Sequence, residues 1–456
     1  MVARRSGTER RLRAWLFGVV VVGTAGIAWP VAASPPIEHW QTANGARVYF
    51  VAAPEIPMVD LRVTFDAGSV RDGEQGGVAV MTNALLAEGA GELDADAIAE
   101  RFAALGVSFG NDADRESSTV SLRTLSDPEV LEPALELVAM IVREPRFAAA
   151  DLERERNRLL VGLQSERESP GAIASKAFFK ALYGTHPYAA QPEGDETTVA
   201  ALNRDDLVRF HRRYYVARNA QISIVGAVSR EQAAAIAEQV VGRLPQGERA
   251  PALPPVPELT AAKVIRIEHP SQQSHIIMGQ IGMRRGDPDY FALYVANQVL
   301  GGGGLVSRLN ASIREQRGLA YSVYSYFAPL AQYGPFQMGL QTRNDQVDEA
   351  LRVVRETLAL YHANGPTAAE LEAVKRNITG GFPLNIDNNR KIVGYLGMIG
   401  FYGLPLDYLE RFPARIDALE RETVHEAFRR RIDPRRMITV VVGGSATAQA
   451  KDAATQ

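Results

Sequence analysis

Ile222-Ser-Ile-Val-Gly226 has a counterpart close to the C-terminus, Thr439-Val-Val-Val-Gly443. Each is an apolar, mostly β-branched run closed by glycine, which predicts a buried strand ending at a turn. The closing glycines lie 217 residues apart. A second matching pair, Ala134-Leu135 and Ala350-Leu351, lies 216 residues apart. Because two independent markers agree within one residue, the sequence predicts an internal duplication of about 216 residues.

The surrounding patterns predict both strands and helices in each copy. Alternating Leu61, Val63 and Phe65 indicate a strand in the first copy. Asp127 followed by Pro128 predicts a helix start, and Asp345 is expected to cap the matching helix in the second copy. Helices should also begin at the capping boxes Ser229 with Gln232 and Thr367 with Glu370. Strands and helices mix without regular alternation, so we expect an α+β fold whose halves each have a mostly antiparallel sheet packed with helices.

A proline-rich stretch separates the two copies. Residues 249–257 read Arg-Ala-Pro-Ala-Leu-Pro-Pro-Val-Pro, which predicts an extended, stiff linker. We therefore expect an N-terminal domain over residues 35–248, a linker over 249–262 and a C-terminal domain over 263–447. Residues 448–456 are expected to form a disordered tail.

The first 34 residues have the order of a secretory signal peptide. Five arginines precede an apolar run from Trp15 to Ala33, which ends in the small residues Ala32, Ala33 and Ser34. An uncleaved membrane anchor is the alternative, because this run nearly reaches the ~20 residues that span a bilayer. Pro30 and the small-residue end favour cleavage, so we expect a periplasmic or otherwise exported protein.

Composition excludes several classes of protein. The chain has 456 residues, of which 46% are hydrophobic and 23% charged, as in ordinary soluble proteins. A net charge of −3 and a pI of about 6.2 give no reason to expect nucleic acid as a partner, or a membrane beyond the signal segment. The absence of cysteine excludes disulfides, thiolate zinc sites and cysteine nucleophiles.

The residues alone indicate no self-contained catalytic centre. No two of the seven histidines lie three or four residues apart, so no helix presents a histidine pair to a metal. Glu153, Glu155, Glu166 and Glu168 are interpreted as a solvated helix face. The run from Gly301 to Gly304 is not followed by Lys-Ser or Lys-Thr, which favours a loop between two helices over a phosphate-binding loop.

Several motifs are similar to a known family. Leu300-Gly-Gly-Gly-Gly-Leu-Val-Ser-Arg-Leu309, leading into Ile313-Arg-Glu-Gln-Arg-Gly-Leu-Ala-Tyr-Ser-Val-Tyr324, closely resembles the second-half motif of pitrilysin/insulinase-type zinc peptidases. That family includes mitochondrial processing peptidase. Shorter matches occur at residues 68–77, 183–188 and 402–408, in the family's order. The resemblance covers roughly residues 37–445 and implies two homologous α+β halves hinged by a linker.

The first half departs from the family at its metal site. Active members carry an H-x-x-E-H motif on a helix, and the matching stretch here is Gly77-Val-Ala-Val-Met-Thr-Asn-Ala-Leu-Leu86. Val80 and Ala84 occupy the histidine positions, Asn83 that of the glutamate base, and Gly162 the approximate position of the third ligand. None of these side chains can perform the corresponding role. The resemblance therefore implies that this chain binds no metal.

The second half retains the family's arginine and tyrosine, seven residues apart, as Arg314 and Tyr321. The resemblance implies that they reach the substrate near the scissile carbonyl, where both can donate hydrogen bonds as in an oxyanion hole. Without the resemblance, Arg314 would be an ordinary surface charge, and Tyr321, Tyr324 and Tyr326 ordinary strand residues. Arg308 and Arg317 also match and are interpreted as structural or rim residues.

A degenerate metal site together with a retained Arg/Tyr pair favours one function. We expect the non-catalytic, substrate-binding subunit of an exported heterodimeric zinc metallopeptidase, inactive alone, with zinc on a homologous partner. The main alternative is a zinc-free homodimer that binds peptides or acts as a chaperone. A structural role like that of respiratory-complex core subunits, and an independent hydrolase with a new metal site, are further alternatives. The histidine spacing argues against the last.

Overall fold

The computed structural model describes residues 36–444. The signal-peptide prediction for residues 1–34 and the tail predicted for 448–456 lie outside these residues. No helix within residues 36–444 is both long enough and apolar enough to cross a membrane.

Two sheets form the cores of the two halves. The first has the order β1 (Glu38–Gln41), β2 (Arg47–Ala52), β8 (Ala220–Gly226), β3 (Met58–Phe65), β7 (Ser118–Leu125), β6 (Ser108–Ala113). The second has the order β9 (Lys263–Glu268), β13 (Ile438–Gly443), β10 (Gln273–Ile281), β12 (Pro335–Arg343), β11 (Val323–Phe327). A separate two-stranded ribbon joins β4 (Gly89–Ala90) to β5 (Leu93–Asp94).

Apart from β1, which is present only in the first sheet, the second sheet repeats the pairing of the first. β2 and β8 are parallel, as are β9 and β13, and the pairs that follow in each sheet are antiparallel. The two matching stretches of sequence are β8 and β13, and every residue of both strands is buried. The predicted duplication and the predicted α+β class are therefore confirmed.

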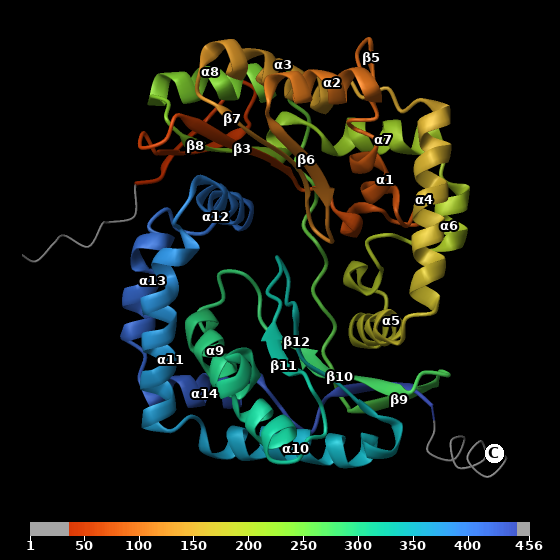
Figure 1. Ribbon diagram of the computed structural model, residues 1–456, viewed down its shortest axis with the longest axis vertical. Coiled ribbons are helices and arrows are strands. Elements are labelled where there is room, and N and C mark those ends of the chain that lie inside the picture. The colour runs from red at the N-terminus through yellow and green to blue at the C-terminus, as the bar shows by residue number, and fades with distance from the viewer. Residues whose placement is uncertain (1–35, 445–456) are drawn as a thin grey trace, which may run out of the picture. The chain divides into compact units, whose positions relative to one another are not determined.

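Helices cover one face of each sheet. Over the first sheet, α3 (Pro128–Arg143) packs on β7 and α8 (Arg230–Val241) on β8 (Figure 1). Over the second, α10 (Val347–Asn364) packs on β12 and α9 (Tyr290–Asn297) on β11. The other helices of the first half, apart from α5, are α1 (Val78–Ala84), α2 (Ala95–Leu105), α4 (Ala149–Arg167), α6 (Glu196–Ala201) and α7 (Arg204–Tyr214). Those of the second half, apart from α12, are α11 (Ala368–Gly381), α13 (Tyr408–Asp417) and α14 (Arg421–Arg431).

The opposite face of each sheet is covered by a helix from the other half. α5 (Pro170–Tyr183) packs on β13 and β10, and α12 (Asn389–Tyr402) packs on the matching strands β8 and β3 (Figure 1). The Gln221 amide of β8 donates to the carbonyl of Gly397 at 2.7 Å. A Cβ at Gly400 would lie 2.3 Å from Gln221 Oε1 and 2.4 Å from Tyr49 Cε2, so a larger residue would force these two buried side chains to shift. Because each half covers a sheet of the other, the described residues 36–444 belong to one compact unit.

Local predictions are mostly confirmed, with two corrections. Asp127 caps α3, and both capping boxes form. The cap predicted at Asp345 is wrong, because its carboxylate binds Arg343 at 3.0 Å and α10 begins only at Val347, after a 3₁₀ turn. The loop predicted at Gly301–Gly304 is also wrong: α9 continues as a π-helical turn, Gln298–Gly302, followed by the 3₁₀ turn Gly304–Val306. A Cβ at Gly301 would lie 2.4 Å from Ser325 Oγ, so glycine lets this wider turn sit against β11.

The proline-rich segment is fastened to the first half at several points. Residues 249–262 contain no helix or strand. Arg71 Nη1 donates to the carbonyl of Pro251 at 2.7 Å, and the Ala250 amide donates to Asn219 Oδ1 at 3.0 Å. His186 Nε2 lies 3.0 Å from the carbonyl of Pro254. The segment therefore follows a defined path against the first half.

Candidate functional site

A cavity of about 260 Å³ lies between α1 and α4, where the family resemblance places the metal ligands. Val80 and Ala84, four residues apart on α1, lie on one face of that helix. Gly162 of α4 faces them across the cavity. The structure thus brings together three positions that lie far apart in sequence.

The side chains around this cavity do not suit a zinc ion. Val80, Ala84, Met81, Leu159 and Gly162 offer no nitrogen, oxygen or thiolate ligand. Within residues 36–444, no group of three His, Cys, Asp or Glu residues is placed to hold a metal ion. The metal chemistry of active relatives therefore has no ligand set in the described part of this chain.

Asn83, at the position of the family's glutamate base, has a structural role. It is buried, and its Nδ2 donates to the carbonyl of Thr119 on β7 at 3.2 Å. Asn111 of β6 donates to Asn83 Oδ1 at 3.1 Å. The amide therefore joins α1 to the sheet, and it does not line the cavity.

Glu155 does not lie on the solvated helix face that the sequence predicts. It is only 8% exposed and lines the cavity together with Arg158. Arg158 Nε donates to Glu155 Oε2 at 2.7 Å. The sequence spacing indicates this position, because residues seven apart lie on one side of a helix and Glu155 precedes Gly162 by seven.

Asp72 holds the start of α1. Its carboxylate accepts hydrogen bonds from the amides of Gly77 at 2.7 Å and Ala79 at 3.0 Å. These amides belong to the first turn, which has no partner within the helix. Burial of the carboxyl raises the pKa of Asp72 to about 7. The predicted apolar face of Val78, Met81 and Leu85 is fully buried, which holds α1 in the core of the first half.

Arg314 and Tyr321 lie side by side in the second half. Arg314 belongs to the π-helical turn Asn310–Glu315, and Tyr321 precedes β11. Between them Gly318 has φ +63°, and its amide donates to the Arg314 carbonyl at 3.0 Å, which reverses the chain. The guanidinium carbon of Arg314 lies 4.6 Å from the centre of the Tyr321 ring. Tyr321 is 83% exposed, so its hydroxyl is open to a ligand.

Tyr321 borders a second cavity, of about 320 Å³, between α5 and the second sheet. His275 of β10 and Tyr324 of β11 also line it. Burial lowers the pKa of His275, and the nearby His269 lowers it further, which favours a neutral imidazole. β11 is the edge strand of its sheet and runs directly from this cavity.

Two other arginines from the resemblance have structural contacts. Arg308 binds both carboxylate oxygens of Glu370, at 2.8 and 2.7 Å, and donates to the Gly365 carbonyl at 3.0 Å. Hydrogen bonding to Arg308 lowers the pKa of Glu370 to about 2. Arg317 Nη1 donates to the Ser312 carbonyl at 2.8 Å. Tyr324 and Tyr326 stack on β11, with ring centres 5.9 Å apart.

Comparisons with known proteins agree with this architecture. Residues 47–195 match the model of insulinase, peptidase family M16, and residues 201–378 match that of the peptidase M16 inactive domain. A crystal structure titled as a peptidase M16 inactive domain, from Pseudomonas fluorescens, is 42% identical with a TM-score of 0.87; the match covers 90% of this chain and 98% of that one.

Two more distant proteins are similar over most of their length. The uncharacterized zinc protease YmxG of Bacillus subtilis is 28% identical over 353 residues, which are 77% of this chain and 85% of the relative. A protease from Helicobacter pylori, 19% identical, has the same fold with a TM-score of 0.82 over 90% of this chain and 99% of that one. The two family models and the Pseudomonas structure together show that the chain belongs to the M16 (insulinase) peptidase family.

Proposed function

We propose that this chain is the non-catalytic, substrate-binding subunit of an exported heterodimeric metallopeptidase. A homologous partner carrying H-x-x-E-H would hold the zinc ion, and this chain would supply Arg314 and Tyr321. One observation carries the proposal: a half-buried arginine and an exposed tyrosine, with the guanidinium carbon 4.6 Å from the ring centre, occur in a chain whose own metal-site cavity is lined by Val80, Ala84 and Gly162.

The pair would act on the peptide carbonyl. The guanidinium of Arg314 and the phenol of Tyr321 are both donors, and both can point at an oxygen that gains negative charge. Because the guanidinium lies beside the ring, the two groups would reach the same substrate atom together. The zinc ion of the partner would supply the Lewis acid and the activated water. This chain would bind and orient the peptide.

The cavity beside Tyr321 offers room for the substrate. Its lining of His275, Tyr324 and Tyr321 suits a peptide side chain. β11 is the edge strand beside it, but its Val323 and Ser325 carbonyls already accept from the side chains of Asn310 and Asn297, at 3.0 Å each, so the cavity and not the strand edge would hold the peptide. The zinc-free peptide-binding or chaperone-like homodimer would use the same surface, so the two functions differ in their partner and not in this cavity.

Purification from the native exported fraction tests the proposal. We expect the chain to co-purify with a homologue that carries H-x-x-E-H, identified by mass spectrometry, and with about one zinc per pair. The pair should cleave peptides, whereas each chain alone should not. A zinc-free homo-oligomer that retains peptides without cleaving them would contradict the proposal and favour the homodimeric binder.

A further inference from the structure

A third cavity, of about 310 Å³, lies where the proline-rich segment crosses the first half. It is lined by β2, the 3₁₀ turn Ala217–Asn219, residues 249–253 and the tip of the β11–β12 hairpin. Its volume is at the lower end of the ~300–1,000 Å³ typical of small-molecule sites. It shares no lining residue with the cavities at Val80 or Tyr321.

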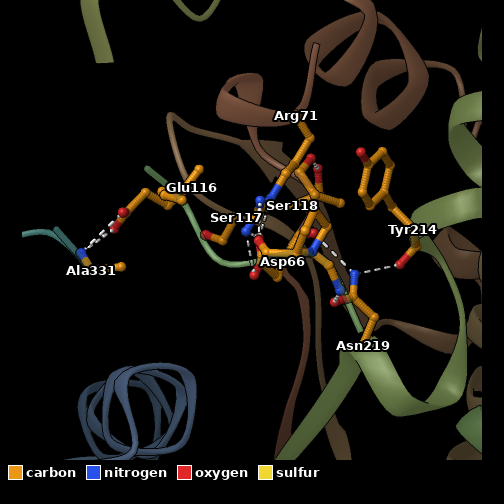
Figure 2. A network of polar contacts seen from close by, with 12 residues as sticks. Asp66, Arg71, Glu116, Ser117, Ser118, Tyr214, Asn219 and Ala331 are labelled. Atoms are coloured by element: carbon orange, nitrogen blue, oxygen red, sulfur yellow. Dashed lines mark hydrogen bonds and ion pairs between the residues drawn. The ribbon is translucent and has the colours of Figure 1, made fainter. Parts of the chain in front are cut away.

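The two carboxyls of this cavity already have partners. Asp66 accepts from Arg71 at both oxygens, at 2.8 Å each. Glu116 accepts from the amide of Ala331 at 3.0 and 3.1 Å, from the hydroxyl of Tyr402 at 2.8 Å, and from the hydroxyl of Tyr188. Figure 2 shows Asp66 and Arg71 together, with Glu116 directed away from them toward Ala331. Within residues 36–444 neither carboxyl forms an ion pair with Arg47, Arg218 or Arg249, although Asp66 attracts Arg47 from a longer distance.

Three further guanidinium groups line the cavity without a carboxylate partner among residues 36–444. Arg218 and Arg249 are exposed, and their side chains form no ion pair or hydrogen bond within that range, although the Arg218 backbone amide donates to the Gln246 carbonyl at 3.0 Å. Arg47 donates to the carbonyl of Gly400 at 2.7 Å, but its buried Nε has no hydrogen-bond partner there. Burial lowers the pKa of Arg47, and the positive charge of Arg249 nearby lowers it further. Like charges are thus held close together with a buried donor unsatisfied, which an anion would relieve.

The remaining wall is apolar and includes Val70, Leu253 and Phe401. Guanidinium groups opposite an apolar wall fit a ligand with a carboxylate at one end and a hydrocarbon body. We propose that this cavity binds a small organic carboxylate, namely an apolar residue with a free α-carboxylate. Arg218 and Arg249 bind the carboxylate, and the apolar wall contacts the side chain. The proposal requires no partner chain and does not depend on the proposed peptidase role.

Calorimetry on the full mature chain tests the site, with N-acetyl-leucine as the probe and N-acetyl-leucinamide as its uncharged match. We expect the acid to bind and the amide not to bind. Arg249→Gln and Arg218→Gln should each weaken binding at least tenfold, because each removes a charge-assisted contact. Arg243→Gln is the matched control: it removes an exposed arginine that does not line the cavity, and binding should be unchanged.

Two further probes identify the source of the carboxylate. A six-residue peptide ending in leucine that binds as tightly as N-acetyl-leucine would assign the site to peptide C-termini. Tenfold weaker binding of that peptide would assign it to a free small carboxylic acid. Equal binding of acid and amide, binding unaffected by Arg249→Gln and Arg218→Gln, or arginine-dependent binding of inorganic phosphate without binding of N-acetyl-leucine would each overturn the proposal. So would the absence of binding by all probes.

Discussion

The guanidinium carbon of Arg314 lies 4.6 Å from the centre of the Tyr321 ring, in a turn that leaves the tyrosine largely exposed. A cation–π contact at such an exposed site contributes only about 0.5–1 kcal/mol. The contact therefore adds little to folding stability, although it places the two donor groups side by side. Because replacing either residue should disturb the fold little, the pair is well suited to a test by substitution.

Arg314→Ala and Tyr321→Phe should each lower kcat of the reconstituted pair by about 10²–10³, as loss of one oxyanion-hole donor does. Assembly with the partner and the free energy of unfolding should change by less than about 1 kcal/mol, because Tyr321 is exposed. Steady-state kinetics and denaturant unfolding measure the two effects. Arg317→Ala and Tyr326→Phe are the matched controls and should leave kcat unchanged. Full activity of both test variants would remove the assigned role.

Zinc binding should return when ligands are restored around the α1–α4 cavity. The triple variant Val80→His, Ala84→His, Gly162→Glu should bind about one zinc per chain, because three protein ligands and a water complete a tetrahedral site. A Cβ at Gly162 meets no atom within 4 Å, so the glutamate has room. The variant should remain inactive, since Asn83 cannot act as a base. Metal content after gel filtration gives the stoichiometry.

The control for zinc binding keeps the two introduced histidines and places the introduced glutamate at position 161 instead of 162. Val161 is 68% exposed, lies next to Gly162 on α4 and does not line the cavity. Val80→His, Ala84→His, Val161→Glu should therefore bind zinc much more weakly. Equal zinc content in the two triple variants would show that Gly162 does not occupy the position of the third ligand.

The duplication could be predicted from sequence because it is encoded locally. A strand buried on both faces is rich in apolar β-branched residues, and both β8 and β13 have this composition, although Gln221 and Ser223 interrupt the apolar run of β8. The cap at Asp127 is equally local, whereas Asp345 has the same residue type in the same context but binds Arg343 instead. A capping residue type therefore predicts that a helix begins nearby, but not at which residue it begins.

Contacts between distant segments could not be predicted in this way. The apolar faces of α5 and α12 predict that each helix is covered, but not that each is covered by the sheet of the other half. Glu155 appeared solvated because charged residues surround it in sequence, and its burial depends on α1 packing against α4. The juxtaposition of Val80, Ala84 and Gly162 was accessible only through the family resemblance.

The hydroxyl of Tyr402 should contribute to the junction of the two halves. It lies at the end of α12 and donates to Glu116, on the β6–β7 hairpin, at 2.8 Å. Tyr402→Phe should lower the free energy of unfolding by about 1–3 kcal/mol, because a buried carboxyl loses a donor. Tyr395→Phe in the same helix is the control, since that hydroxyl makes no hydrogen bond within residues 36–444. Equal unfolding midpoints in urea would contradict the prediction.

Asp72 should make stability depend on pH between about 4 and 7. Burial raises the pKa of its carboxyl from 3.8 to about 7 in the folded chain, so the folded state binds the proton more tightly than the unfolded state. The stability due to this proton is fully present below about pH 4 and is lost as pH rises toward 7 and above. At about 1.36 kcal/mol per pKa unit, the rise in the pKa of Asp72 corresponds to a loss of about 4 kcal/mol in the free energy of unfolding between these pH limits.

Asp72→Asn tests this dependence because asparagine does not titrate yet can still accept a hydrogen bond from the Gly77 or Ala79 amide. Urea unfolding of both proteins from pH 4 to 8 gives the difference in free energy at each pH. As pH rises, the free energy of unfolding of the unsubstituted chain should fall steadily relative to that of Asp72→Asn. This trend is expected whichever of the two proteins is the more stable at pH 4. Asp433→Asn is the control: this carboxylate binds exposed Arg435, which lowers its pKa, so its contribution should change only near and below pH 4. If the free energies of unfolding of the unsubstituted chain and Asp72→Asn differed by the same amount from pH 4 to 8, the two amide hydrogen bonds would keep Asp72 ionised throughout. α1 would then be capped by a carboxylate rather than by a carboxylic acid.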